Sequence, residues 1–156
     1  MQQTNNEQPL RPYRISRILS WGHCDPAGII YTPRALDYAV EMLEAWNRDV
    51  LGTSWVTLRN KMSLGFPTVR AELDFLKPPA VDDVIILDLE VLELGRSSMT
   101  TQVSGHDGAD KVYFVVKLVS CLISVPEFRS HEILPEIRQR ILAYQAVCRE
   151  NSPTQN

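Results

Sequence analysis

The residues with the clearest chemical potential lie near the N-terminus, in the stretch WGHCDPAGIIYTP at residues 21–33. A histidine, a cysteine and an aspartate occupy positions 23, 24 and 25, and a Pro-Ala-Gly turn follows them. The carboxylate of Asp25 could activate water as a general base or attack a carbonyl carbon itself. Asp-Pro sequences with a nearby glycine also initiate turns in many proteins, so from these residues alone a structural role for Asp25 is the more common one.

A thiol nucleophile is the first alternative, since Cys24 follows His23 directly. Adjacent residues on an extended segment point to opposite sides, so they rarely form a cysteine–histidine dyad, and we do not expect a catalytic Cys24. The three cysteines are scattered and odd in number, which indicates free thiols instead of a disulfide framework. No C-x-x-C pair and no zinc-type spacing of histidine and cysteine occurs, so no metal site is expected.

The segment that follows must hold these side chains in place, and it has strong helix signals. Thr32 can serve as the N-cap, with a proline directly behind it. Leu36, Val40 and Leu43 recur at helical spacing, and Gly52 provides a stop. We predict a helix of about 19 residues, the longest in the chain.

The remaining segments predict an antiparallel sheet. Apolar and polar residues alternate from Val69, and later runs of β-branched residues are separated by turn clusters. We predict strands at residues 13–19, 66–78, 84–95, 96–105 and 111–124, a short helix or turn at 53–62, and a terminal helix at 134–150. Strands joined by hairpins pair antiparallel, and one long helix needs a sheet face to cover. The prediction is an α+β protein whose antiparallel sheet wraps around one long central helix.

Length and composition limit the possible classes of protein. The 156 residues correspond to about one domain, with 44% hydrophobic and 22% charged residues. A net charge of -3 gives no basic surplus, so nucleic-acid binding is not expected. No apolar run reaches the roughly 18 residues of a membrane span, and the polar N-terminus does not resemble a signal peptide. We expect a cytoplasmic protein with one domain at residues 13–150 and flexible tails at residues 1–12 and 151–156.

The sequence GHCDPAGIIY before a long helix, followed by strands, resembles the 4-hydroxybenzoyl-CoA thioesterase family of hotdog-fold proteins. The family pattern is close to G-D-C-D-P-A-G-[IV], and this chain departs from it only at His23, which replaces the first aspartate. The resemblance extends from about Tyr13 to about Val125. It implies a hotdog fold, a homodimer or homotetramer with active sites at the dimer interface, and hydrolysis of a CoA thioester to a free acid without a separate cofactor.

The resemblance also implies roles for individual residues. Asp25 matches the catalytic carboxylate, acting as a general base or as a nucleophile. His23 could orient water, stabilise the charge of Asp25 or simply face solvent. Gly65 stands where the family places backbone donors for the thioester carbonyl, although a glycine here could also only permit a turn.

Further residues are candidates for binding the substrate. Arg96 matches a family position that contacts the nucleotide part of CoA, with Ser97 and Ser98 as possible phosphate donors, although Arg96 could equally be a solvated residue at a strand end. Thr32 stands where some family members have a tyrosine. Candidates without a motif are the acyl-lining residues Tyr31, Tyr38, Met42 and Phe66 and the cations Arg59, Lys61 and Arg70.

Two other functions remain open at this stage. A hotdog-fold hydratase acting on enoyl-CoA would use a carboxylate and a histidine, but the spacing of His23 and Asp25 differs from the usual helix-borne pair. A non-catalytic module that binds acyl-CoA or an acyl carrier is also compatible with the fold, because a fold does not specify a function. The Asp-Pro-Ala-Gly sequence favours the hydrolase, since a binding module has no need for a free carboxylate beside the thioester.

Overall fold

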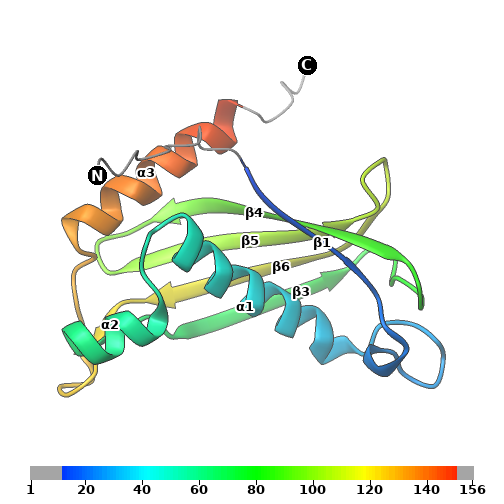
Figure 1. The fold of residues 1–156 in the computed structure, drawn as a ribbon, viewed down its shortest axis with the longest axis horizontal. Coiled ribbons are helices and arrows are strands. Elements are labelled where there is room, and N and C mark those ends of the chain that lie inside the picture. The colour runs from blue at the N-terminus through cyan, green and yellow to red at the C-terminus, as the bar shows by residue number, and fades with distance from the viewer. Residues whose placement is uncertain (1–11, 151–156) are drawn as a thin grey trace, which may run out of the picture.

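The computed structural model describes residues 12–150 of the 156-residue chain. The tails predicted to be flexible, residues 1–12 and 151–156, lie outside the described residues apart from residue 12. Figure 1 shows a curved sheet with a long helix, α1, crossing one of its faces and a second long helix, α3, along one side. None of the helices in the described part of the chain is both long enough and apolar enough to span a membrane.

The elements follow one another in nearly the predicted order. They are β1 (Tyr13–Ile18), a 3-10 turn (Trp21–His23), α1 (Thr32–Asp49), α2 (Trp55–Met62), β2 (Leu64–Gly65), β3 (Thr68–Phe75), β4 (Val84–Leu94), β5 (Ser98–His106), β6 (Val112–Cys121), β7 (Ile123–Ser124), β8 (Arg129–Ser130) and α3 (Pro135–Glu150). The predicted strands and both long helices are confirmed. The predicted strand at residues 111–124 includes β7, whereas β2 and β8 were not predicted, because a two-residue strand has no periodicity to detect.

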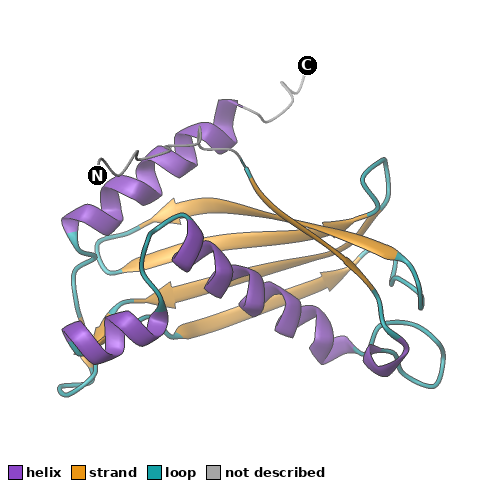
Figure 2. Ribbon diagram, viewed as in Figure 1, coloured by secondary structure: helices purple, strands orange, loops and turns teal. Residues whose placement is uncertain are grey.

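The main sheet has five strands in the order β1-β4-β5-β6-β3, and each neighbouring pair is antiparallel. Inward-facing residues of β4, β5 and β6 are buried in alternation with partly exposed ones, as expected for a sheet with one covered face. Figure 2 shows the helices against this sheet. The predicted arrangement, an antiparallel sheet wrapped around one long helix, is confirmed.

The long helix α1 is held by a stripe of large buried side chains. Tyr38, Met42 and Trp46 recur every four residues and are at most 1% exposed. Burial of each such side chain stabilises the fold by roughly 1.5–3 kcal/mol. Of the predicted stripe, Leu43 is buried, whereas Leu36 and Val40 are only partly buried at its border. Tyr38 and Met42, candidates for lining an acyl pocket, belong to the core.

The start of α1 also differs from the prediction by one residue. Tyr31, and not Thr32, occupies the N-cap position, with extended backbone angles and no side-chain cap. Thr32 is the first helical residue and its side chain is exposed. The proline at position 33 fits the first turn because the N–H groups there have no partner within the helix.

The terminal helix α3 is fastened to the sheet by two buried polar side chains. The Tyr144 hydroxyl donates to the Leu89 carbonyl at 2.5 Å and accepts a hydrogen bond from the Tyr13 N–H at 2.9 Å. Gln145 donates to the carbonyl of Val91, beside a bulge in β4. The Tyr144 ring packs edge-on against Trp46, with 5.3 Å between ring centroids. The helix therefore closes the end of the core beyond α1.

Replacing Tyr144 with phenylalanine tests this attachment. The variant leaves the Leu89 carbonyl and the Tyr13 N–H without their buried partner, so the free energy of unfolding should fall by about 1–3 kcal/mol in urea titrations. Tyr13→Phe is the matched control. Among residues 12–150 the Tyr13 hydroxyl bonds only to the exposed Asp49 carboxylate, so its loss should cost less than about 1 kcal/mol. Equal losses in both variants would contradict the assignment.

Candidate functional site

The stretch that the sequence singles out forms a closed loop over residues 19–31, between β1 and α1. Its two sides meet at a bridge between Cys24 and Ile30. The Tyr31 N–H also donates to the His23 carbonyl at 2.9 Å. The loop thus has hydrogen bonds across its own base, in the manner of a small hairpin.

A second set of hydrogen bonds ties this loop to residues 79–83, which connect β3 to β4. The Ile30 N–H donates to the Pro79 carbonyl, and the Val81 N–H donates to the Gly28 carbonyl. A bridge between Ile29 and Ala80 lies between these two bonds. The tip of the loop is therefore fixed by a neighbouring segment of the fold as well as by its own backbone.

Asp25 begins the turn at the tip of the loop. Its carbonyl accepts from the Gly28 N–H and its N–H donates to the Ile29 carbonyl, both at 2.9 Å. Its carboxylate atom Oδ1 accepts from the Ala27 N–H at 2.8 Å. The atom Oδ2 has no hydrogen-bond partner among residues 12–150, and the residue is half-buried. The turn thus uses one carboxylate oxygen to orient the group and leaves the other available.

His23 points into the protein from the same loop. Its atom Nδ1 lies 2.6 Å from the hydroxyl of Tyr38, in the second turn of α1. The guanidinium of Arg17 on β1 lies over the Tyr38 ring, 4.2 Å from its centroid, and pairs with Glu41 at 2.9 Å. Of the three options for His23, an imidazole exposed only to solvent is therefore wrong.

Cys24 does not form a dyad with His23, as predicted. Its thiol donates to the Ser20 carbonyl, with 3.6 Å between sulfur and oxygen. Burial, together with the charges of Asp25 and Asp82, raises the pKa of the Cys24 thiol and so disfavours the nucleophilic thiolate at neutral pH. Within the described residues, none of the three cysteines forms a disulfide.

Gly65 and Phe66 lie at a cavity of about 390 Å³ beside α1 and α2. Phe66 is 7% exposed, and a Cβ atom on Gly65 would approach the Val125 side chain to 3.3 Å. The remaining lining residues are mostly apolar, with one cation: Val40, Trp55, Arg59, Leu64, Pro67, Thr68 and Val125. In the sequence, Arg59 was one of three candidate cations without a motif. The short helix α2 places it at this cavity.

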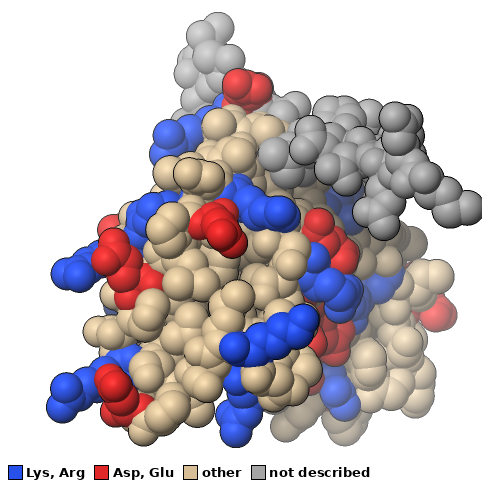
Figure 3. Space-filling view, turned by 60° about the vertical axis from the view of Figure 1, so that its left-hand side comes forward, with Lys and Arg blue, Asp and Glu red and all other residues tan. Residues whose placement is uncertain are grey.

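Arg96 and Ser97 lie in the turn between β4 and β5, and Ser98 is the first residue of β5. The Arg96 side chain is 81% exposed and lies 3.4 Å from the Glu132 carboxylate. The backbone of this turn is held by α3, since Arg138 donates to the carbonyls of Gly95 and Arg96. Figure 3 shows the side of the molecule that carries α2, where basic side chains are interspersed with acidic ones over a mostly uncharged surface.

The predicted residues fall into two groups at opposite ends of the sheet. The loop with His23, Asp25, Tyr31 and Thr32 follows β1, whose last residue pairs with the first residue of β4. The turn at residues 96–98 follows the far end of β4, and eleven residues of strand span about 35 Å. The strand β2, which contains Gly65, pairs with β7 just beyond the end of β6 and thus lies near this turn. Within one chain the two groups are not brought together.

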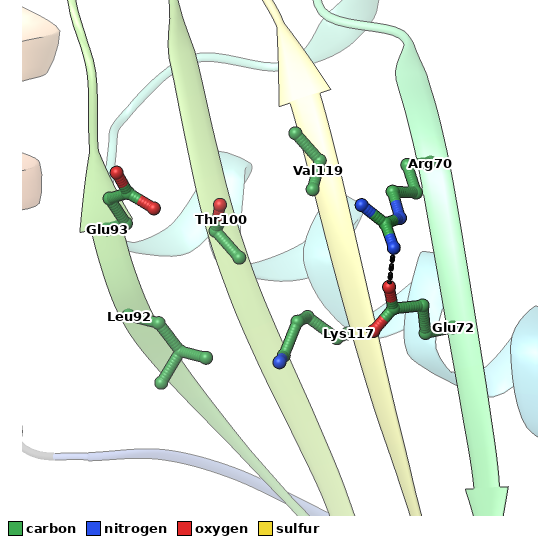
Figure 4. Close-up of a pocket in the computed structure, with 7 residues that line it drawn as sticks. All are labelled: Arg70, Glu72, Leu92, Glu93, Thr100, Lys117 and Val119. Carbon is green, nitrogen blue, oxygen red and sulfur yellow. Dashed lines mark ion pairs between the residues drawn. The ribbon is translucent and has the colours of Figure 1, made fainter.

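A second cavity, of about 450 Å³, lies on the face of the sheet that α1 does not cover. Figure 4 shows its side chains on β3, β4, β5 and β6. Arg70 and Glu72 on β3 form an ion pair, and the Lys117 side chain extends from β6 toward Leu92 on β4. Of the residues that the sequence offered as candidates, Arg70, a cation without a motif, lines this cavity. Among residues 12–150, no cluster of three or more His, Cys, Asp or Glu side chains is arranged to hold a metal ion.

The conformation of Gly28 gives a direct test of the loop. Gly28 has φ +77° and nothing lies within 4 Å of a Cβ at this position, so Gly28→Ala would strain only the backbone and should lower the free energy of unfolding by about 1–2 kcal/mol. Gly22, in the same loop, has equally open surroundings but lacks a positive φ, so Gly22→Ala should be neutral or stabilise by up to about 1 kcal/mol. The two free energies of unfolding are measured by chemical denaturation. A decrease for Gly28→Ala without a decrease for Gly22→Ala would support the loop geometry, and equal changes would contradict it.

Comparisons with known proteins agree with this fold. The model of the thioesterase superfamily matches residues 48–114. The 1,4-dihydroxy-2-naphthoyl-CoA hydrolase of Synechococcus elongatus is 28% identical over 88 residues, which are 54% of this chain and 62% of that protein. The chain therefore matches about three fifths of the length of this curated relative.

Solved structures extend the similarity over nearly the whole chain. A thioesterase superfamily protein from Jannaschia sp. CCS1 has a TM-score of 0.76 and 26% identity, covering 91% of this chain and 96% of that one. A protein from Staphylococcus aureus, solved in complex with CoA, has a TM-score of 0.83 and 12% identity, covering 97% and 92%. The chain therefore has the hotdog fold, and its central residues are similar to the thioesterase superfamily.

Proposed function

We propose that the chain is an acyl-CoA thioesterase that hydrolyses a CoA thioester to a free acid and CoA, with Asp25 as its catalytic carboxylate. The main support is the turn at residues 25–28, which orients one carboxylate oxygen through the Ala27 N–H and leaves the other without a partner among the described residues. The second set of hydrogen bonds, between the loop and residues 79–83, holds this turn and its carboxylate in place.

Either of two reactions gives these products. As a general base, Asp25 accepts a proton from water while the water oxygen bonds to the thioester carbon. The carbon–sulfur bond then breaks, and the CoA thiolate takes up a proton. As a nucleophile, Asp25 instead displaces the thiolate to form a mixed anhydride, which water then hydrolyses. Neither reaction uses a separate cofactor, because CoA is part of the substrate.

We further propose that a complete site needs two copies of the chain. The edge strand β3 has neighbours on one side only and exposes Val69, which is 63% accessible. Such an edge can pair with the same edge of a second copy about a two-fold axis. This arrangement reverses the second sheet, so the loop of one copy lies toward the end of the other copy that carries Gly65 and Arg96. The resulting homodimer could further associate to a homotetramer.

The substrate is assigned by chemistry as well as by similarity. In this proposal Arg96, Ser97 and Ser98 contact the nucleotide part of CoA, and Tyr31, Thr32 and Phe66 contact the pantetheine or acyl part. The backbone near Gly65 stabilises the carbonyl oxygen as it gains negative charge. A mostly apolar cavity of about 390 Å³ beside Phe66 suits an aromatic or short acyl group. The similarity to a naphthoyl-CoA hydrolase supports the aromatic class. The cytoplasmic location stays a prediction from the sequence.

Asp25→Asn tests the proposed chemistry. The amide can neither accept a proton from water at neutral pH nor form an anhydride, so kcat/KM should fall by about 10²–10⁴. The measurement is thiol release from a panel of aromatic, short-chain and long-chain acyl-CoA esters. Asp110→Asn, in the exposed turn after β5, is the control and should retain activity.

Other outcomes of the same panel would favour the competing functions. Full activity in an Asp25→Asn variant that keeps its oligomeric state would remove Asp25 from the chemistry. Loss of absorbance with crotonyl-CoA without thiol release would favour the hydratase. Tight binding of acyl-CoA without turnover would favour the non-catalytic module.

A charge on the open sheet edge tests the two-copy site. Val69→Glu should shift the protein toward monomer in analytical ultracentrifugation, because two like charges would meet across the paired edges. Activity should fall in parallel, since a monomer carries the two groups of site residues at opposite ends of its sheet and cannot bring them together in one site. Val56→Glu places the same charge at a side chain that is 67% exposed on α2 and should change neither property. A fully active monomeric Val69→Glu would contradict the shared site.

A further inference from the structure

The contact between His23 and Tyr38 bears on which ring nitrogen of the loop histidine carries a hydrogen. The Tyr38 hydroxyl oxygen lies 2.6 Å from Nδ1 of His23, and the two rings are tilted by 58° at a centroid distance of 5.6 Å. Tyr38 is only 1% exposed. The buried Tyr38 hydroxyl cannot exchange this partner for water, so its hydrogen needs an acceptor within the protein.

The Tyr38 hydroxyl is the donor in this hydrogen bond. Within the described residues, His23 is the only acceptor in contact with that hydroxyl, because the neighbouring Arg17 guanidinium can only donate. If Nδ1 carried the hydrogen, the phenolic hydrogen would be buried without an acceptor. Burial raises the pKa of Tyr38, and the Arg17 guanidinium beside its ring only partly offsets this, so the phenol keeps its proton at neutral pH.

The hydrogen of a neutral His23 then resides on Nε2. No described residue accepts a hydrogen bond from this atom, which leaves it available to a bound molecule. The nearby charged groups include Arg17 on β1, Arg34 and Glu41 on α1, and Asp25 on the loop itself. Arg17 forms an ion pair with Glu41, and Arg34 forms one with Asp37. The loop therefore carries a hydrogen-bond donor two residues before its free carboxylate oxygen.

We propose that Tyr38 is a positioning residue that holds His23 in the neutral Nε2–H tautomer, so that His23 donates a hydrogen bond to the thioester carbonyl oxygen of an acyl-CoA bound beside Asp25. This inference rests on the proposed function. An aspartate at position 23, as in the family pattern, is an acceptor when ionised, so the histidine reverses the polarity of this position. A donor aimed at an oxygen that gains negative charge stabilises the transition state more than the ground state.

The tautomer can be measured without any enzymatic assay. In long-range ¹H–¹⁵N correlation spectra of the ¹⁵N-labelled full chain at neutral pH, His23 should show an unprotonated Nδ1 and a protonated Nε2, with its signals assigned by their absence in His23→Gln. Tyr38→Phe should convert His23 to a mixture of tautomers. Tyr144→Phe removes an equally buried hydroxyl on α3 and should leave the His23 signals unchanged. A protonated Nδ1 in the unmodified protein would overturn the proposal.

Kinetics test the role of the donor. Tyr38→Phe should lower kcat on the order of tenfold with little change in KM, a part of the loss expected when one transition-state donor is removed. Glutamine at position 23 keeps an N–H donor and has no tautomers, so His23→Gln should retain more activity than His23→Leu. Adding Tyr38→Phe to His23→Gln should then have little further effect, and full additivity in this cycle would contradict the coupling.

The two proposals fail in different ways. If no CoA ester in the panel is hydrolysed, the proposed thioesterase function is wrong, and with it the donor role of His23, whereas the spectra still decide whether Tyr38 fixes the tautomer. If esters are hydrolysed but Tyr38→Phe, folded as judged by circular dichroism, has unchanged kcat, the positioning role alone is wrong.

Discussion

The packing of α1 against the inner face of the sheet is the constraint on which the rest of the structure depends. Tyr38, Met42 and Trp46 fix both the rotation and the translation of this helix over β4, β5 and β6. Its first turn therefore has one position relative to the sheet, and so does the loop that enters it. Tyr38 connects the core to the loop, because its ring is part of the core and its hydroxyl contacts His23. Core packing and site geometry are thus set by the same side chain.

Within that frame, the loop satisfies its polar groups almost entirely through its own turn and through the β3–β4 connection. The turn orients Asp25, and residues 79–83 hold the turn in place. A half-buried carboxylate with one free oxygen is a chemically useful result of this arrangement, since the group is oriented before any substrate arrives. The two groups of candidate residues are separated by the length of the sheet. The proposed function therefore requires a second copy of the chain.

Much of this could be predicted from sequence, for identifiable reasons. The strands from Val84 onward alternate cleanly, and the terminal-helix stripe of Ile137, Ile141 and Tyr144 is buried as predicted. The N-cap was misplaced by one residue because Tyr31 caps α1 through backbone geometry alone, without a side-chain signal. The Tyr38–His23 contact could not be predicted, since it depends on how the loop folds back over the helix. The cavity beside Gly65 was equally hidden, because α2 supplies Trp55 and Arg59 from outside any motif.

The double attachment of the loop has a consequence for how this chain could vary. Residues 24 and 30 are paired with each other, and residues 28–30 are paired with residues 79–81, so an inserted or deleted residue in either segment would break contacts in both. Length variation is cheaper in the turn after β5, because in the described part of the chain its exposed residues form hydrogen bonds only within the hairpin. Homologues that keep the loop should therefore also keep its length and that of the β3–β4 connection, whatever substitutions they carry elsewhere.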